Sequence, residues 1–294
     1  MILKPDYFKR PNPRVSVVVP ILGGEKSPHL ERLLGELKQQ TFQDFEVLVV
    51  AGIEPNGHAR NEGVAEARGQ WLVFIDETVS LGHEKILENL LEPFFARPEA
   101  RIAITGASTV WPGSIKTFQR DYLRMREFIS PVVEELTESG QVQHACMAIP
   151  KDIYKKAGWE SDHLITGTDN DLRRRVSQAG YSMCLVPRTW VHILPPATVG
   201  EICRKTFRKG KGAAYAFLIF PGLFDPPRFL GIPLRNPFAR LFYEIGSGLL
   251  KLLHPRYFFC PAKFIYVGAG TLGFVSGWFQ YFGKKTFEDR KDLR

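Results

Sequence analysis

Val15-Ser-Val-Val-Val-Pro20, near the start of the chain, is a short β-branched run that ends in proline. Such a run predicts a buried strand. A helix is expected next, because apolar residues recur at i, i+3, i+4 and i+7 at Leu30, Leu33, Leu34 and Leu37. A second apolar run, Phe45–Val50, predicts the second strand. Strand, helix and strand in this order are typical of a parallel α/β sheet.

The same alternation continues along the chain. We expect a polar helix, a third strand, an amphipathic helix and a fourth strand over Asn61–Arg68, Trp71–Ile75, residues 84–96 and Arg101–Thr105. The sequence therefore predicts an α/β fold in which helices flank a mostly parallel sheet. Ligands of such sheets bind beyond the carboxyl ends of the strands, so a site is expected after Pro20, Val50 and Ile75.

The composition excludes several classes of protein. The chain has 294 residues, of which 44% are hydrophobic and 24% charged, as in an ordinary folded domain. Disorder, collagen and long coiled coils do not fit these values. The four cysteines show neither a CxxC motif nor Cys/His metal spacing, so we expect a reducing compartment and no disulfide scaffold. The first residues lack the apolar core of a secretory signal.

Charge is distributed unevenly along the chain. The formal net charge is +8, but residues 201–294 contain 16 of the 39 basic and 6 of the 31 acidic residues, a net charge of +10. Residues 1–200 therefore carry a net charge of −2. Basic residues mixed with apolar runs favour a membrane surface over a nucleic acid. We expect an α/β domain over residues 1–200, followed by a basic, apolar, membrane-associated helical region over 201–294.

Residues 264–283 form an uncharged run of 20 residues with lysines on both sides. Its length suits a transmembrane helix, but an interfacial helix and a buried helix of a soluble domain fit the composition too. Basic residues on both flanks indicate no orientation. Gly273 and Gly277 have the GxxxG spacing of associating membrane helices, so a homodimer through this segment is a further expectation.

Acidic residues follow the third predicted strand. Asp76, Glu77 and Thr78 stand at the edge where a parallel sheet presents ligand-binding side chains. Oxygen ligands at that edge suit Mg²⁺ or Mn²⁺ bound to a diphosphate. A solvated acidic turn explains the same residues without any function.

A second acidic group, Thr168-Asp169-Asn170-Asp171, opens another predicted helix. Thr168 can cap this helix, and the helix dipole favours carboxylates in the first turn. Capping is thus a sufficient structural explanation for both acids. The functional interpretation is that Asp169 acts as a general base, and the spacing alone does not choose between the two.

His192 and a basic cluster come further along the chain. An isolated histidine is more often structural than a ligand, and a basic cluster is usually a solvated surface. Arg204 and Arg208 are four residues apart, so on a helix they share one side. Two guanidinium groups on one side suit a diphosphate or a lipid phosphate.

Five blocks of sequence together resemble the family 2 glycosyltransferases of GT-A fold. They are Val15–Pro20, Gln40–Val50, the segment from Ala59-Arg60-Asn61 to Asp76, the segment from Gly167 to Tyr181, and Val191-His192 with Phe207–Gly212. The blocks stand in the family's order and at its spacing. The resemblance covers residues 14–215.

The resemblance implies roles for the matching residues. Asp76 corresponds to the first acid of the metal-binding DxD motif, with Thr78 at the position of the second acid and His192 near the metal and the leaving diphosphate. Asp169 corresponds to the base that deprotonates the acceptor hydroxyl. The donor is assigned to Pro20, Arg60, Asp76 and Glu77, and the acceptor or its phosphates to Thr168, Arg204 and Arg208.

The chain departs from the family pattern at two points. Thr78 offers a neutral hydroxyl where the motif has its second acid, so we expect weaker metal affinity than in a full DxD enzyme. Ala51-Gly52-Ile53-Glu54 replaces the acidic segment whose first acid contacts the base of the donor in the family.

The implied activity is inverting transfer of a sugar from a nucleotide-sugar, with a UDP-sugar favoured and Mg²⁺ or Mn²⁺ as cofactor. The expected acceptor is a lipid-linked or envelope glycan at the cytoplasmic face of the plasma membrane. One alternative is a weakened family member that binds nucleotide or a partner at the membrane. Another is a nucleotidyltransferase or methyltransferase, although Gly23-Gly24 does not make a GxGxxG turn. A nucleic-acid binder is disfavoured by the near-neutral body of the chain.

Overall fold

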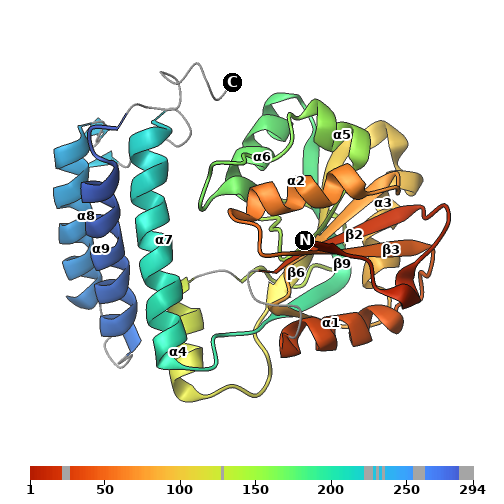
Figure 1. Ribbon diagram of the computed structural model, residues 1–294, viewed down its shortest axis with the longest axis horizontal. Helices are drawn as coiled ribbons and strands as arrows, with labels where there is room; N and C mark the ends of the chain where they lie inside the picture. The colour runs from red at the N-terminus through yellow and green to blue at the C-terminus, as the bar shows by residue number, and fades with distance from the viewer. Residues whose placement is uncertain are drawn as a thin grey trace. The chain divides into compact units, whose positions relative to one another are not determined.

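The computed structural model describes residues 1–21, 27–126, 129–221, 228–229, 232–233, 236–253 and 262–284. The chain forms two compact units (Figure 1). The first unit contains residues 1–113, 128–163 and 168–194, and the second contains residues 114–127, 164–167 and 195–294. The domain division expected between residues 200 and 201 stays a prediction.

The first unit is built on one sheet, whose strands run in the order β1-β3-β2-β4-β8-β6-β9-β5, with β7 paired to β9. Three of the predicted strands form one side of it: β3 (Phe45–Ala51), β2 (Val15–Ile21) and β4 (Trp71–Ile75). β2 pairs in parallel with both of its neighbours. The strand–helix–strand alternation therefore predicted this half of the sheet correctly.

The other half of the sheet differs from a simple alternation. β8 (Cys146–Pro150) lies antiparallel between β4 and β6 (Ile102–Val110), so β6 points the same way as β4. β6 then pairs in parallel with β9 (Ser182–Ile193). The strand expected at Arg101–Thr105 is thus longer than predicted, and it is separated from β4 by one reversed strand.

Short strands complete the sheet at its ends. β1 (Ile2–Leu3) is antiparallel to β3, and β5 (Val79–Leu81) and β7 (Thr137–Glu138) are antiparallel to β9. Since β2, β3, β4, β6 and β9 share one direction, the sheet is mostly parallel, and the predicted fold class is confirmed.

Helices cover the two faces of the sheet. On one face, α1 (Pro28–Lys38) and α3 (Ile86–Ala96) share a core with β2 and β3. On the other face, α2 (Asn56–Glu66), α5 (Lys151–Lys156) and α6 (Thr168–Gln178) share a second core (Figure 1). Two 3₁₀ turns, η1 (Asp6–Phe8) and η2 (Pro98–Ala100), join these elements.

The helix predicted over Asn61–Arg68 begins earlier, at Asn56, and the predicted start was wrong. The added first turn contains Gly57, which suggests a turn in sequence but has a packing function here. A Cβ atom at this position would lie 2.4 Å from the carbonyl oxygen of Ser161. The absent side chain therefore lets the backbone of α2 approach the loop before α6. Because α2 begins at Asn56, Arg60 lies within the helix and not before it.

The second unit is helical. It contains α4 (Thr117–Arg126), α7 (Val199–Ile219), α8 (Pro237–Leu253) and α9 (Ala262–Tyr281), and a small hairpin of β10 (Arg228–Phe229) and β11 (Ile232–Pro233). The predicted run 264–283 falls almost entirely on α9. Among the helices that the structure describes, none is both long and apolar enough to cross a membrane.

The GxxxG segment packs against α7 of the same chain. A Cβ atom on Gly273 would lie 2.0 Å from the carbonyl oxygen of Phe207, and one on Gly277 would lie 2.8 Å from that of Lys211. Glycine at both positions lets two helix backbones meet closely. These glycines therefore serve a helix contact within one chain, and the homodimer expected through this segment stays a prediction.

Candidate active site

Asp76 follows the last residue of β4, at the carboxyl edge of the sheet. Its backbone N–H donates to the Ala145 carbonyl over 3.2 Å, and its Oδ1 accepts from the Arg60 Nη2 over 2.8 Å. The side chain is 36% exposed. Burial, together with the charge of Asp76, raises the pKa of the neighbouring Cys146 to about 12, so this thiol stays protonated. The Asp76 carboxylate is therefore bound by Arg60 and still partly exposed to solvent.

Arg60, on α2, is buried behind Asp76, with 3% of its side chain exposed. Its Nη1 lies 3.3 Å from the Oε2 of Glu160. Burial lowers the pKa of Arg60, but the charges of Glu160 and Asp76 outweigh burial and raise it above its ordinary value. The guanidinium group therefore stays charged and bridges two carboxylates. The sequence placed Arg60 near the nucleotide, and that role stays a prediction.

Glu160 is a fully buried carboxylate in the loop between α5 and α6. Its Oε1 lies 2.9 Å from the His144 Nε2, and it accepts a hydrogen bond from the Thr168 side chain. Burial raises its pKa, but His144 and Arg60, together with the hydrogen bonds, hold the pKa at about 2. Glu160 is thus ionised at neutral pH.

The loop that carries Glu160 is itself fixed by α2. The amide nitrogen of the Asn61 side chain donates to the Glu160 carbonyl over 2.8 Å, and its oxygen accepts from the Glu160 N–H over 3.1 Å. The same oxygen accepts from the Tyr154 hydroxyl over 2.6 Å. Sequence reasoning missed Glu160, His144 and Tyr154. Asn61 alone carried a signal, since it lies in one of the matched blocks.

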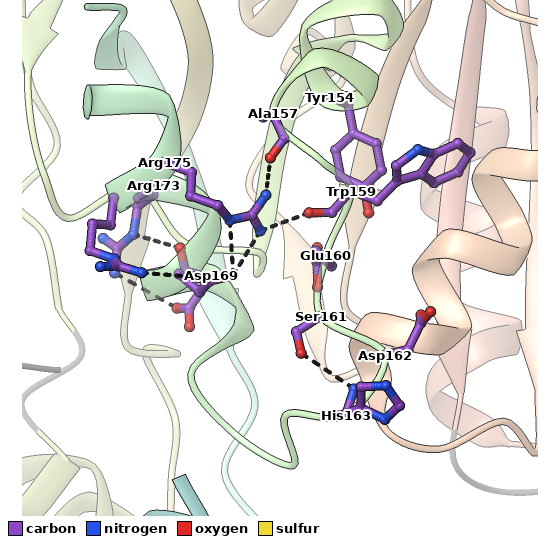
Figure 2. A network of polar contacts seen from close by, with 12 residues as sticks. Tyr154, Ala157, Trp159, Glu160, Ser161, Asp162, His163, Asp169, Arg173 and Arg175 are labelled. Carbon is purple, nitrogen blue, oxygen red and sulfur yellow. Dashed lines mark hydrogen bonds and ion pairs between the residues drawn. The ribbon is translucent and has the colours of Figure 1, made fainter. Parts of the chain in front are cut away.

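The two acids of α6, Asp169 and Asp171, have different surroundings. Asp171 is nearly buried and accepts from the Arg175 Nη2 over 2.7 Å. Arg175 also donates to the Trp159 carbonyl over 2.7 Å and to the Ala157 carbonyl, so this pair ties α6 to the preceding loop (Figure 2). Asp171 therefore has a structural function.

Asp169 is freer than Asp171. Its carboxylate is 31% exposed and lies 3.9 Å from the Arg173 Nη2 (Figure 2). The carboxylate of Asp169 is therefore more weakly paired than that of Asp171. The structure thus distinguishes the two acids, which the spacing alone did not.

One chain of polar contacts joins the two acidic groups that the sequence singled out. Asp76 contacts Arg60, Arg60 contacts Glu160, and Glu160 contacts Thr168, which precedes Asp169. All of these residues belong to the first unit. Asp76 and the first turn of α6 therefore lie at the two ends of a single buried network. The hydroxyl of Thr168 is used inside this network, and its assignment to the acceptor stays a prediction.

Thr78 and His192 lie on paired segments. The carbonyl of Thr78 accepts from the Leu194 N–H over 3.0 Å, and His192 stands opposite Ser80 in the pairing of β5 with β9. The His192 Nδ1 lies 3.2 Å from the Trp111 carbonyl. β5 thus places Thr78 and His192 two register positions apart.

The turn after Asp76 is held from α1. The Arg32 Nη2 donates to the carbonyls of Glu77 and Val79 over 3.2 and 2.7 Å. The Glu77 Oε2 is buried and has no hydrogen-bond partner among the residues that the structure describes. An unpartnered buried carboxylate oxygen is costly unless a ligand satisfies it. The oxygens of Asp76, Glu77 and Thr78 therefore fit a hard divalent cation.

This set is small for a metal site. Within the described segments, no group of three or more His, Cys, Asp and Glu residues could hold a metal ion by itself. The candidate set combines carboxylates with a neutral hydroxyl, and a diphosphate would have to supply further oxygens. The expected weakness of metal binding stays a prediction.

The remaining predicted site residues are placed as follows. Pro20 is the sixth residue of β2, buried and paired with Val50. Arg204 and Arg208 lie one turn apart on α7, in the second unit, with Arg204 exposed. α7 begins at a cap in which the Thr198 Oγ1 accepts from the Glu201 N–H over 3.2 Å. The donor and phosphate roles of these three residues stay predictions.

A cavity of about 670 Å³ opens at the opposite edge of the sheet. It is lined by residues at the start of β4 and β6, including Trp71 and Ile102, and by Lys151 at the start of α5. Asp76 lies beyond the other end of β4, so this cavity is separate from the candidate active site.

The order of these elements and the acids at the sheet edge agree with a known family. A family model described as glycosyltransferase like family 2 matches residues 7–212. The chain belongs to glycosyltransferase family 2. The family resemblance and the GT-A fold inferred from the sequence are therefore confirmed.

Two individual proteins are similar to this family 2 glycosyltransferase. Glycosyltransferase AglE of Haloferax volcanii is 23% identical over 244 residues, which cover 70% of this chain and 75% of that protein. Mannosyltransferase PcManGT from Pyrobaculum calidifontis, solved in complex with GDP-Man and Mn²⁺, has a TM-score of 0.57 and 14% identity, covering 90% of this chain and 87% of that one. At 14% identity the structural likeness establishes the fold alone.

Proposed function

We propose that the chain transfers a sugar from a nucleotide-sugar to a hydroxyl group by inverting single displacement, with Asp169 as the base. The observation that carries the proposal is the buried network that joins Asp76 to the first turn of α6. The network binds Asp76, the acid proposed for the donor side. Asp169, the acid proposed for the acceptor side, is only weakly paired. Asp169 removes the hydroxyl proton while the oxygen attacks the anomeric carbon, and the bond from that carbon to the nucleoside diphosphate breaks on the opposite face.

The donor side would be held at the carboxyl edge of β4. Asp76, Thr78 and His192 would hold Mg²⁺ or Mn²⁺ together with oxygens of the donor diphosphate, and the ion would neutralise charge on the leaving diphosphate. The described complex of PcManGT with GDP-Man and Mn²⁺ supports a nucleotide diphosphate and a divalent cation as ligand classes. A UDP-sugar remains the donor that the sequence favours.

The acceptor would be a lipid-linked or envelope glycan at the cytoplasmic face of the plasma membrane. Large apolar side chains on α8 and α9 support this assignment, since Phe242, Leu250, Leu253 and Phe279 are each about 70% exposed or more. The net charge of +10 over residues 201–294 supports an anionic surface, and Arg204 and Arg208 are the candidates for phosphate contacts.

The first test is a thermal-shift screen of UDP-, GDP- and CDP-sugars with and without Mn²⁺. A ligand that binds the folded state raises the apparent Tm by an amount set by its concentration relative to Kd. We expect one nucleotide to raise the Tm, more strongly with Mn²⁺, and EDTA to reverse the added effect. A Tm unchanged by every nucleotide would contradict the proposal.

The second test replaces the proposed base. Asp169→Asn keeps the size of the side chain but removes its basicity, so turnover should fall by about 10²- to 10⁴-fold while donor binding is retained. Asp152→Asn is a matched control, because Asp152 is an exposed acid on α5 paired with Lys156. Asp169→Asn with wild-type turnover would exclude Asp169 as the base.

A weakened family member that binds a nucleotide without transferring sugar is the second candidate. The neutral Thr78 and the small set of metal-binding side chains favour it. Hydrolysis of the bound nucleotide-sugar in the absence of an acceptor separates the two functions. A transferase is expected to hydrolyse its donor slowly, whereas a pure binder is expected to leave it intact.

A further inference from the structure

We propose that Glu160 is a positioning residue that sets the geometry of both sides of the active site. Through Arg60 it would orient Asp76, and through Thr168 it would orient the first turn of α6, which carries Asp169. This inference rests on the proposed function, since it concerns the same site. Neither the sequence blocks nor the roles implied by the family assign anything to Glu160.

The first connection runs through Arg60. The guanidinium group is planar, and its donors form a rigid fork, so a carboxylate fixed on one branch restricts the orientation of the other branch. Glu160 contacts Nη1 over 3.3 Å, and Asp76 contacts Nη2 over 2.8 Å. Because Arg60 and Glu160 are both buried, the fork has little freedom to turn. The orientation of the Asp76 carboxylate is thus coupled to Glu160.

The charge of Glu160 matters as much as its shape. Arg60 alone would neutralise Asp76 and weaken its attraction for a cation. The Glu160 carboxylate offsets the charge of Arg60, so that the Asp76 charge remains available at the sheet edge. A neutral side chain at position 160 would leave Arg60 with Asp76 as its single anionic partner among the described contacts. Cation binding should therefore depend on Glu160.

The second connection runs through Thr168. Its side chain donates a hydrogen bond to Glu160, and it is the first residue of α6. The backbone of α2 presses on the same place, since a Cβ atom on Gly57 would lie 3.0 Å from the Thr168 Cγ2 and 3.4 Å from the Glu160 Cβ. The position of the first turn, and with it that of Asp169, is thus coupled to the same carboxylate.

The test compares Glu160→Gln with Glu46→Gln in the 294-residue chain. Glu46 is a matched control, because it is a buried carboxylate bound to Arg68 over 2.6 Å and to Ser16 over 2.8 Å, on β3 and apart from the candidate site. Both variants should lower the Tm, since each leaves a buried arginine or hydroxyl partner with a weaker acceptor. A loss of Tm that both variants share shows only that each carboxylate stabilises the fold, and it does not test positioning.

The readout that separates positioning from stability is Mn²⁺ binding well below the Tm of each variant. Mn²⁺ is titrated in the presence of GDP-mannose or UDP-glucose, whichever the wild-type protein binds, and followed by tryptophan fluorescence. Glu160→Gln should raise the half-saturating Mn²⁺ concentration by about 10- to 100-fold, whereas Glu46→Gln should leave it unchanged. Thr168→Val should lower kcat while the half-saturating Mn²⁺ concentration stays near that of the wild type.

If Glu160→Gln does not fold, Glu160→Asp takes its place. It keeps the charge but shortens the side chain, so Mn²⁺ binding should weaken less than kcat. A Glu160 variant that matches Glu46→Gln in its Mn²⁺ titration and its kcat would overturn the inference while leaving the proposed function intact. A wild-type protein that binds no nucleotide-sugar with or without Mn²⁺ would overturn both.

Discussion

At the scale of single residues, exposure and pairing decide which acids are free to act. Asp171 is bound by Arg175 over 2.7 Å, whereas the ion pair of Asp169 with Arg173 in the described part of the chain is 3.9 Å long. The sequence identified Asp76 and Asp169 because each stands at the end of a strand or the start of a helix. It did not identify Glu160 or His144, since a buried ion pair between distant segments leaves no local pattern.

The buried Glu160 also gives the protein a specific acid sensitivity. A carboxyl group with an ordinary pKa of 4.5 and a folded-state pKa of about 2 contributes stability, on the order of 3 kcal/mol, which is complete above pH 4.5 and is lost as the pH falls toward 2. Glu160→Gln lacks this contribution. Its urea midpoint should lie below that of the wild type at neutral pH, and the gap should narrow between pH 4.5 and about 2. A gap that stays constant over this range would contradict the lowered pKa.

At the scale of elements, hydrophobic patterns predicted which segments form strands and helices more reliably than they predicted which strands pair with each other. β4 was found with its observed bounds, because Trp71–Ile75 is a continuous apolar run. β8 was not predicted. It lies antiparallel between β4 and β6, and this placement depends on a chain reversal that the local sequence pattern does not indicate. The early start of α2 includes Gly57. This glycine is needed because the Ser161 backbone packs directly against it, and that contact is not visible in the sequence.

Glycines on α9 allow a direct test of the packing of two helices. Gly273→Ala would place a Cβ atom 2.0 Å from the Phe207 carbonyl oxygen, so α7 and α9 would have to separate. We expect a destabilisation of about 1–3 kcal/mol. Gly268 is the matched control on the same helix, because a Cβ atom there meets nothing within 4 Å. Gly268→Ala should stabilise the protein slightly, by up to about 1 kcal/mol. Equal Tm values for the two variants would contradict the observed packing.

At the scale of the whole molecule, the charge difference between the body and the C-terminal region predicts a response to lipid composition. The 294-residue chain should bind vesicles of phosphatidylcholine mixed with phosphatidylglycerol more strongly than vesicles of phosphatidylcholine alone. Added NaCl should reduce this preference, because screening weakens the attraction between basic residues and anionic lipid. Co-sedimentation measures the effect. Equal binding to both kinds of vesicle would exclude an electrostatic contribution of residues 201–294.

The sequence by itself determined the α/β class, the parallel pairing of the first strands, the family and the positions of Asp76 and Asp169. These properties follow from local patterns, since apolar periodicity and strand ends are properties of neighbouring residues. The tertiary structure alone decided the reversed β8, the packing of Gly273 and Gly277 against α7, and the network through Glu160. Each of these depends on segments that are far apart in the chain, where close packing and the pairing of buried charges select the partners.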